Sequence, residues 1–210
     1  MRAIIMAGGD GTRWNNYLGT PKHLLTLEGE RLIDRTIRLL DERGVEEIIP
    51  LCPYPDVPNS QLPAYTQCDT DKFRSTIPLW APDALSLVLY GDVWFSEEAM
   101  DAIISPLQDP FRWFGREHAS KITGTPYGEL FGLTIAPEGQ ARISHSIETV
   151  RGLLMNNRIG RGGGWEVYRH SVGVPLSKHV LNGYFHDIND WTDDFDFPAD
   201  YDRWVASRPL

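Results

Sequence analysis

The sequence has few cysteines, no long hydrophobic run and a shortage of positive charge, and each shortage excludes a class of protein. Cys52 and Cys68 are the only cysteines in 210 residues, which excludes a disulfide framework and a cysteine-rich zinc site. No apolar run approaches the roughly 20 residues that cross a membrane. The N-terminus enters an apolar strand pattern directly, so we expect no signal peptide and a cytoplasmic protein with reduced thiols.

The charge balance is acidic. Lys and Arg number 20 against 29 Asp and Glu, which gives a formal net charge of −9 at pH 7. Nucleic-acid-binding proteins usually carry a basic surface, so this balance argues against a nucleic acid as partner. It does not argue against a nucleotide, because a few local cations and a metal ion decide that binding. A length of 210 residues and a hydrophobic content of 41% suit one globular domain with a substantial core.

One glycine-rich segment near the N-terminus carries most of the functional information. The apolar residues 1–7 stop at Gly8-Gly9-Asp10-Gly11-Thr12-Arg13, and Pro21-Lys22 follows. Glycines let the backbone approach a ligand, and consecutive N–H groups in such a loop form a concavity that binds anions. An arginine grips phosphate oxygens in pairs, and a lysine supplies a compact charge. The segment predicts a phosphate-binding loop made of Ala7, Gly8, Gly9, Asp10, Gly11, Thr12, Arg13 and Lys22.

This loop differs from two common phosphate-binding motifs. No Lys-Ser or Lys-Thr pair follows the last glycine, so it is not a Walker A motif. Position 14 is Trp14 rather than glycine, so it is not a dinucleotide fingerprint. The glycines alone would also suit a tight strand-to-helix connection, and it is the added Arg13 and Lys22 that favour phosphate binding.

The pattern Gly-Gly-x-Gly-Thr-Arg with a later Pro-Lys resembles the signature of nucleotidyltransferases that activate sugar phosphates, which are related to molybdopterin guanylyltransferases and cytidylyltransferases. Residues 24–33 also resemble the continuation of that signature into a helix. The resemblance implies one three-layer α/β/α, Rossmann-like domain of GT-A type over residues 1–210, with a mixed, mainly parallel sheet. It also implies Mg²⁺-dependent chemistry, in which Arg13 and Lys22 are the catalytic cations on the triphosphate.

Periodicity and capping residues predict most of the regular elements. Strand, helix and strand within residues 1–52 indicate a right-handed βαβ unit. Residues 160–164 are so rich in glycine that we expect no regular element there. The predicted strands are 1–7, 45–52, 85–90 and 129–136, and the predicted helices are 30–43, one capped by Ser96, one from 137 to about 156, and one opened by Pro198.

Two acidic segments are candidate metal sites. Asp92 follows a hydrophobic strand directly, at the sheet edge where open α/β sheets bind ligands, although a turn or capping role is the alternative. The late segment that contains Asp194, Asp196 and Asp200 resembles the family's closing motif and implies Asp196, with Asp194 beside it, as the second ligand. A competing alignment of residues 183–189 assigns Asp187 instead, and Asp200 is expected to serve the following helix.

Three further positions carry weaker predictions. Arg74 and Ser75 lie where cytidylyltransferase relatives carry an arginine-serine stretch near the base, although the start of a helix is an equal alternative. Glu166, after the glycines, is a candidate acceptor of sugar hydroxyls, with an ordinary surface turn as the alternative. Trp14 either packs in the core or covers a nucleotide or sugar face.

The expected reaction is therefore nucleotidyl transfer between an NTP and a sugar phosphate or similar polyol phosphate, which gives a nucleotide-activated sugar and pyrophosphate. Residues 110–186 are expected to bind the acceptor, and homo-oligomer formation is left open. A glycosyltransferase with a nucleotide-sugar donor is one alternative, but the Asp-x-Asp that such enzymes usually carry is Asp92-Val93-Trp94 here. A non-catalytic nucleotide-binding module is the other.

Overall fold

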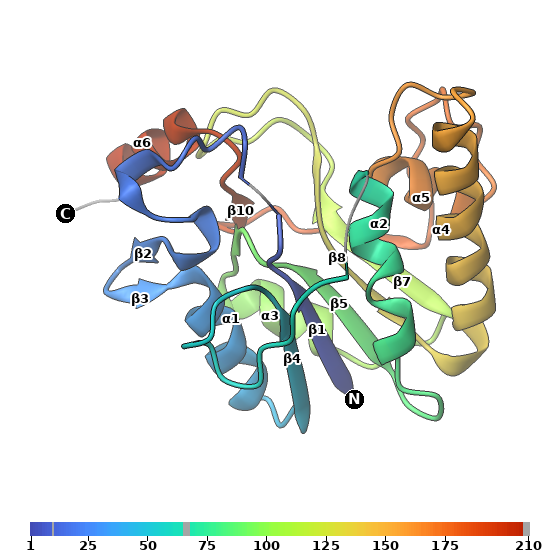
Figure 1. The fold of residues 1–210 in the computed structure, drawn as a ribbon, viewed down its shortest axis with the longest axis horizontal. Helices are drawn as coiled ribbons and strands as arrows, with labels where there is room; N and C mark the ends of the chain where they lie inside the picture. The colour runs from blue at the N-terminus through green and yellow to red at the C-terminus, as the bar shows by residue number, and fades with distance from the viewer. Residues whose placement is uncertain (10, 65–67, 208–210) are drawn as a thin grey trace.

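A six-stranded sheet forms the centre of the computed structural model, which describes residues 1–9, 11–64 and 68–207 (Figure 1). The strand order is β4-β1-β5-β8-β7-β9. Strand β1 is parallel to β4 and β5, and β7 is parallel to β9, whereas β8 is antiparallel to both of its neighbours. The mixed, mainly parallel sheet is confirmed. The strands are β1 (Arg2–Met6), β4 (Glu47–Leu51), β5 (Ser86–Tyr90), β7 (Phe111–Arg116), β8 (Glu129–Ile135) and β9 (Phe185–Asp187).

Helices cover both faces of the sheet, as expected for an α/β/α architecture. Alternate residues of β1 point to opposite faces, so Ile4 packs on one side and Ile5 on the other. The side of Ile4 is covered by α2 (Asp69–Arg74), α4 (Gln140–Met155) and α5 (Gly164–Ser171), which contribute Phe73, Ile147 and Val167 among others. The opposite side is covered by α1 (Leu32–Asp41) and α3 (Glu97–Ile104).

A smaller assembly lies beyond the carboxyl ends of β1 and β5. Its core joins the segment after the glycine-rich loop to the C-terminal helix through Trp14, Trp94, Phe195 and Trp204. Strand β10 pairs antiparallel with β6, and Phe195 N donates to the carbonyl of Asp92 at 3.1 Å. These contacts bring the late acidic segment to Asp92. The elements are β2 (Thr26–Leu27), β3 (Glu30–Arg31), β6 (Val93–Trp94), β10 (Asp193–Asp194) and α6 (Pro198–Ser207).

Four short 3-10 turns complete the regular structure of the described residues: Tyr17–Gly19, Lys22–Leu24, Ile77–Leu79 and Pro137–Gly139. Among those residues, no helix has both the length and the apolar character needed to cross a membrane.

Two sequence predictions differ from the structure at glycine or turn positions. The helix expected from residue 30 begins at Leu32, because Glu30–Arg31 pairs with Thr26–Leu27 as a small hairpin. The glycine stretch does not lack regular structure throughout, because Gly164 begins α5. A Cβ at Gly164 would overlap the hydroxyl of Tyr90, so the glycine allows close contact with the sheet rather than mobility.

Candidate active site

Lys22 lies between two carboxylates that are far apart in sequence. Its Nζ forms an ion pair with Asp92 and a second one, at 3.0 Å, with Oδ1 of Asp196. Arg13 Nη1 reaches the other oxygen of Asp196 at 2.6 Å. Both predicted catalytic cations and two of the three predicted metal ligands therefore meet at one place, beyond the carboxyl ends of β1 and β5.

The Lys22–Asp92 pair is charged and largely buried. The two side chains are only 10% and 16% exposed. Burial acts to raise the pKa of Asp92, but the Lys22 ammonium outweighs it and holds that pKa at about 2. Burial acts in the opposite sense on Lys22, whose pKa is nevertheless raised by Asp92 and Asp196. Both groups remain ionised at neutral pH, so the site holds a buried, fixed cation.

The start of the glycine-rich loop packs closely against neighbouring residues. A Cβ on Gly8 would lie 2.5 Å from Cγ of Pro63, and one on Gly91 would lie 2.6 Å from Cβ of Ala7. Gly11 has a φ of +58°, in the left-handed region that glycine favours. Thr12 is exposed, and Asp10 lies outside the described residues. Beside the loop is a small pocket lined by Met6, Gly8, Gly9, Leu51, Pro63, Lys72 and Ser75.

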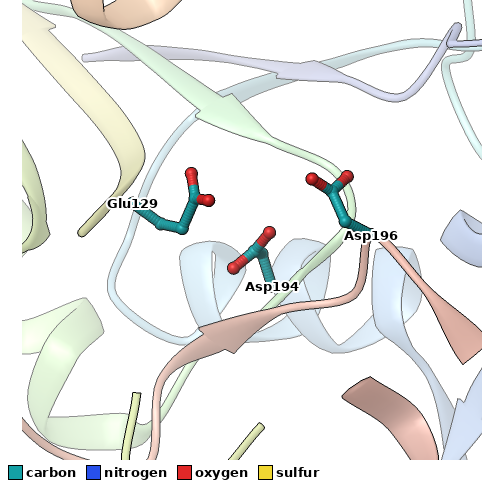
Figure 2. Close-up of side chains that lie close together, drawn as sticks. All are labelled: Glu129, Asp194 and Asp196. Atoms are coloured by element: carbon teal, nitrogen blue, oxygen red, sulfur yellow. The ribbon is translucent and has the colours of Figure 1, made fainter. Parts of the chain in front are cut away.

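A cluster of three carboxylates lies next to Asp196. Glu129, Asp194 and Asp196 each offer an oxygen within 4.8 Å of the other two, and the side chains point toward a common space (Figure 2). Oδ1 of Asp194 is buried and has no hydrogen-bond partner among the residues that the structure describes. Burial, together with repulsion from Asp196, raises the pKa of Glu129 to about 8. Burial and the neighbouring Glu129 also raise the pKa of Asp194.

Glu129 is the one member of this cluster that the sequence analysis did not select. Its only signal was a carboxylate at the first position of the apolar strand predicted at 129–136. An acidic residue at the start of a strand is usually an ordinary surface residue. Its place beside Asp194 and Asp196 is known only from the structure.

Two buried carboxylates hold the backbone of this acidic segment in place. Asp193 forms a buried ion pair with Arg116 and accepts a hydrogen bond from Thr123 Oγ1 at 2.9 Å. Asp200 accepts hydrogen bonds from Asp196 N at 3.1 Å and from Phe197 N at 2.7 Å, which is the predicted role at the start of α6. The orientation of Asp194 and Asp196 is therefore fixed from both sides.

The remaining predicted residues lie outside this centre. Asp187 Oδ1 accepts a hydrogen bond from Glu117 N at 2.7 Å and is not in the carboxylate cluster. Glu166 accepts from Gly163 N and pairs with Arg169, both at 3.0 Å. Trp14 is 1% exposed and donates to the Thr20 carbonyl, so its role is in the core.

The Arg74-Ser75 pair is divided between two environments at the end of α2. Ser75 lines the pocket beside the glycine-rich loop, whereas Arg74 forms an ion pair with Glu148 at 2.8 Å on the surface. Both residues also line a second hollow together with Asp71 and Pro78.

Comparison with known proteins identifies the family. The model described as the MobA-like NTP transferase domain matches residues 3–107, which include the glycine-rich loop, Lys22 and Asp92. No sequence among the curated proteins matches the chain.

Three solved structures share the fold over almost the whole chain. One, assigned as a glucose-1-phosphate thymidylyltransferase of Bacillus anthracis, has a TM-score of 0.62 at 12% identity and covers 100% of this chain and 96% of its own. The CTP:phosphocholine cytidylyltransferase of Streptococcus pneumoniae gives 0.60 at 16%, with 99% of each chain covered. The inositol-1-phosphate CTP transferase of T. maritima gives 0.62 at 15%, with 95% and 90% covered. With half of its length matched by the family model and its fold shared with nucleotidyltransferases, the chain belongs to the MobA-like NTP transferase family.

Proposed function

We propose that this nucleotidyltransferase joins an NTP to a sugar phosphate or similar polyol phosphate and releases pyrophosphate. The observation that carries the proposal is the position of Lys22 between Asp92 and Asp196, beside the glycine-rich loop. The three similar structures are named for glucose-1-phosphate, phosphocholine and inositol-1-phosphate, all of which are phosphate monoesters. That shared substrate chemistry supports a phosphate monoester as the acceptor here.

In this proposal, the chain binds the nucleotide through its cations and backbone amides. Arg13 and the glycine-rich loop hold the β- and γ-phosphates, and Lys22 contacts the α-phosphate. Both cations are paired with carboxylates in the free protein, so nucleotide binding exchanges carboxylate oxygens for phosphate oxygens. An acceptor phosphate oxygen forms a bond to the α-phosphorus, the bond from that phosphorus to the bridging oxygen breaks, and pyrophosphate leaves. The nucleophile is already an anion, so alignment and charge neutralisation suffice without a general base.

The acidic residues fit a divalent cation such as Mg²⁺. Within the described part of the chain, Oδ1 of Asp194 is a buried acceptor without a hydrogen-bond partner, next to the carboxylate of Asp196. Mg²⁺ prefers one or two carboxylates, with phosphate oxygens and water completing its coordination. We propose that Asp194 and Asp196 would hold the ion, with Asp92 as a further ligand. The ion would supply positive charge that neutralises the reacting phosphates.

The two substrates are assigned to different parts of one domain that spans the chain. The pocket that includes Ser75 and the loop glycines is the proposed nucleobase site, with Arg74 at its outer side. Residues 110–186 are proposed to contribute the acceptor site. Glu166 is proposed to contribute to it, and in the free protein its oxygens bind Gly163 N and Arg169.

The test is a grid of four NTPs against a panel of phosphate monoesters, scored for pyrophosphate with and without Mg²⁺. We expect pyrophosphate from a restricted set of pairs and only with the metal. Activity with a nucleotide-sugar donor, without any pyrophosphate, would instead identify a glycosyltransferase. Absence of Mg²⁺-dependent turnover with every NTP would leave a nucleotide-binding module.

A further inference from the structure

Positive charge at the site does not balance the negative charge. Lys22 and Arg13 are matched by Asp92 and Asp196, with which they form ion pairs. A third nearby cation, Arg116, forms an ion pair with Asp193. The two side chains are 8% and 0% exposed. Among the described residues, each of these three cations is therefore already paired with an acid other than Glu129 and Asp194.

Glu129 and Asp194 are the acids without a partner. Within residues 1–9, 11–64 and 68–207, neither side chain forms an ion pair, although Asp194 is only 8% exposed. Oδ1 of Asp194 has no hydrogen-bond partner and lies in the cluster toward which Glu129 and Asp196 also point (Figure 2). A buried carboxylate oxygen left in this way costs free energy unless the group takes up a proton or a cation reaches it. One divalent ion would supply the charge that neutralises both carboxylates in their ionised form.

The spacing of the three carboxylates suits such an ion. Their nearest oxygens lie within 4.8 Å of one another. Around one octahedral Mg²⁺ at ~2.1 Å, adjacent ligand oxygens are about 3.0 Å apart and opposite ones about 4.2 Å, so the three carboxylates need to draw in by at most ~1.8 Å, within the reach of side-chain rotation. The segment that carries Asp194 and Asp196 is fixed by Asp193 and Asp200, and Glu129 begins a central strand. The donors are therefore held in place before any nucleotide arrives.

We propose that Glu129 is a metal ligand and that, with Asp194 and Asp196, it forms a divalent-cation site that fills in the absence of nucleotide. This inference rests on the proposed function for its purpose, since the ion would lie beside the phosphate-binding cations. The sequence predicted Asp92, Asp194 and Asp196 as metal ligands. The proposed site adds Glu129 and omits Asp92, which is paired with Lys22 in the free protein. An all-carboxylate donor set suits Mg²⁺, Mn²⁺ or Ca²⁺ rather than a softer metal.

The experiment measures Mn²⁺ binding to the nucleotide-free protein, by the loss of the free-ion electron paramagnetic resonance signal. The wild-type chain is compared with Glu129→Gln, Asp194→Asn and a control, Glu98→Gln, which changes an exposed acid on α3. We expect one site in the wild type and in the control, and an affinity at least tenfold weaker in the two cluster variants. Thermal unfolding with and without Mn²⁺ gives a second readout, in which only the wild type and control gain stability.

Three outcomes would overturn the inference. One is a wild-type protein that binds no Mn²⁺ without nucleotide, and another is Glu129→Gln with unchanged Mn²⁺ affinity. The third is an equal loss of affinity in Glu98→Gln. Pyrophosphate assays on the same samples test the proposed function separately. Turnover in a protein that binds no Mn²⁺ without nucleotide would contradict the preformed site but support the function. Mn²⁺ binding without turnover would support the site but contradict the function.

Discussion

Asp196 is the residue on which the two halves of the site depend. One of its oxygens contacts Lys22 and the other contacts Arg13, while the same carboxylate belongs to the cluster with Glu129 and Asp194. A ligand bound at Lys22 and Arg13 therefore changes the electrostatic potential at the carboxylate cluster, and a cation bound at the cluster changes it at Lys22 and Arg13. The cations proposed to bind phosphate and the acids proposed to bind metal are thus linked through one side chain.

At the residue scale, variants of the buried Lys22–Asp92 pair allow its effect on stability to be measured separately from its effect on activity. Lys22→Met leaves Asp92 as a buried charge without its cation, and we expect a loss of about 3–5 kcal/mol in the free energy of unfolding. The double variant Lys22→Met/Asp92→Asn should recover most of that stability, because neither partner is then charged. Its pyrophosphate release should stay reduced by ~10²–10³, as expected when one cation on the reacting phosphate is lost. Urea unfolding and a pyrophosphate assay on both variants check this, and a double variant with near-normal turnover would contradict the role of Lys22.

His23 makes the stability dependent on pH. It is 3% exposed, and burial lowers its pKa to about 4 despite the nearby Asp92. In the unfolded chain its pKa is near 6.5, so between pH 6.5 and 4 the unfolded state binds the proton and the folded state does not. The contribution of His23 to the free energy of unfolding is therefore at its maximum above pH 6.5. It decreases as the pH falls and is lower by about 2 kcal/mol at pH 5.

The measurement for His23 is the free energy of unfolding at pH 8 and at pH 5 in the wild type and in His23→Gln. Other groups titrate in both proteins, so the difference between the two curves isolates this side chain. The variant should lose about 2 kcal/mol less than the wild type over that range. Parallel curves would mean that His23 is not held neutral in the fold.

At the element scale, strand β7 supports the acidic segment through one arginine. Arg116, near the end of β7, pairs with the fully buried Asp193 of β10, whereas Arg112 on the same strand forms a more exposed pair with Asp109. We expect Arg116→Ala to cost about 3–5 kcal/mol and Arg112→Ala under about 1 kcal/mol. Urea unfolding of the two variants provides the comparison, and similar losses would show that Arg116 does not anchor β10.

Helix α5 contacts the sheet at a point where only glycine fits. A Cβ at Gly164 would overlap the hydroxyl of Tyr90. Gly164→Ala should therefore destabilise the protein by about 1–3 kcal/mol, as overpacking does. Tyr90→Phe removes the clashing oxygen, so the double variant should be more stable than Gly164→Ala alone. Melting temperatures of the three variants decide this, and a double variant no more stable than Gly164→Ala would place the strain elsewhere.

At the scale of the whole molecule, substrate binding should appear as a gain in stability. A ligand that binds only the folded state stabilises it by about 2.7 kcal/mol at a hundred times its Kd. For a chain of this length, that corresponds to a rise in Tm of about 5–10 °C. We expect this rise with one preferred NTP plus Mg²⁺ and expect none with Lys22→Met/Asp92→Asn. An equal rise in the variant would show that the nucleotide binds away from Lys22.

The architecture explains why the site forms at one end of the sheet. Strands β1 and β5 are parallel neighbours, so the glycine-rich loop and Asp92 leave the sheet at the same edge. The antiparallel β8 begins near that edge and brings Glu129 to it. The small C-terminal assembly then completes the site through the pairing of β10 with β6.

Local features of the sequence determined the elements and the family. Apolar runs, the Ser96 cap and Pro198 each act within a few residues, and they were sufficient to predict β1, β5, α3 and α6. The glycine-rich motif with Arg13 and Lys22 identified the nucleotidyltransferase family, because the residues that form the motif are close together along the chain.

Only the tertiary structure decided which side chains meet. Lys22 and Asp196 are 174 positions apart, and no local pattern reports that Lys22 also neutralises Asp92. Glu129 lies beside Asp194 and Asp196 because β8 runs antiparallel between β5 and β7. The sequence of β7 does not alternate clearly between apolar and polar residues, so β7 was not predicted as a strand. Short-range propensities act within one element, whereas the charge balance of a buried site depends on every segment that the fold brings to it.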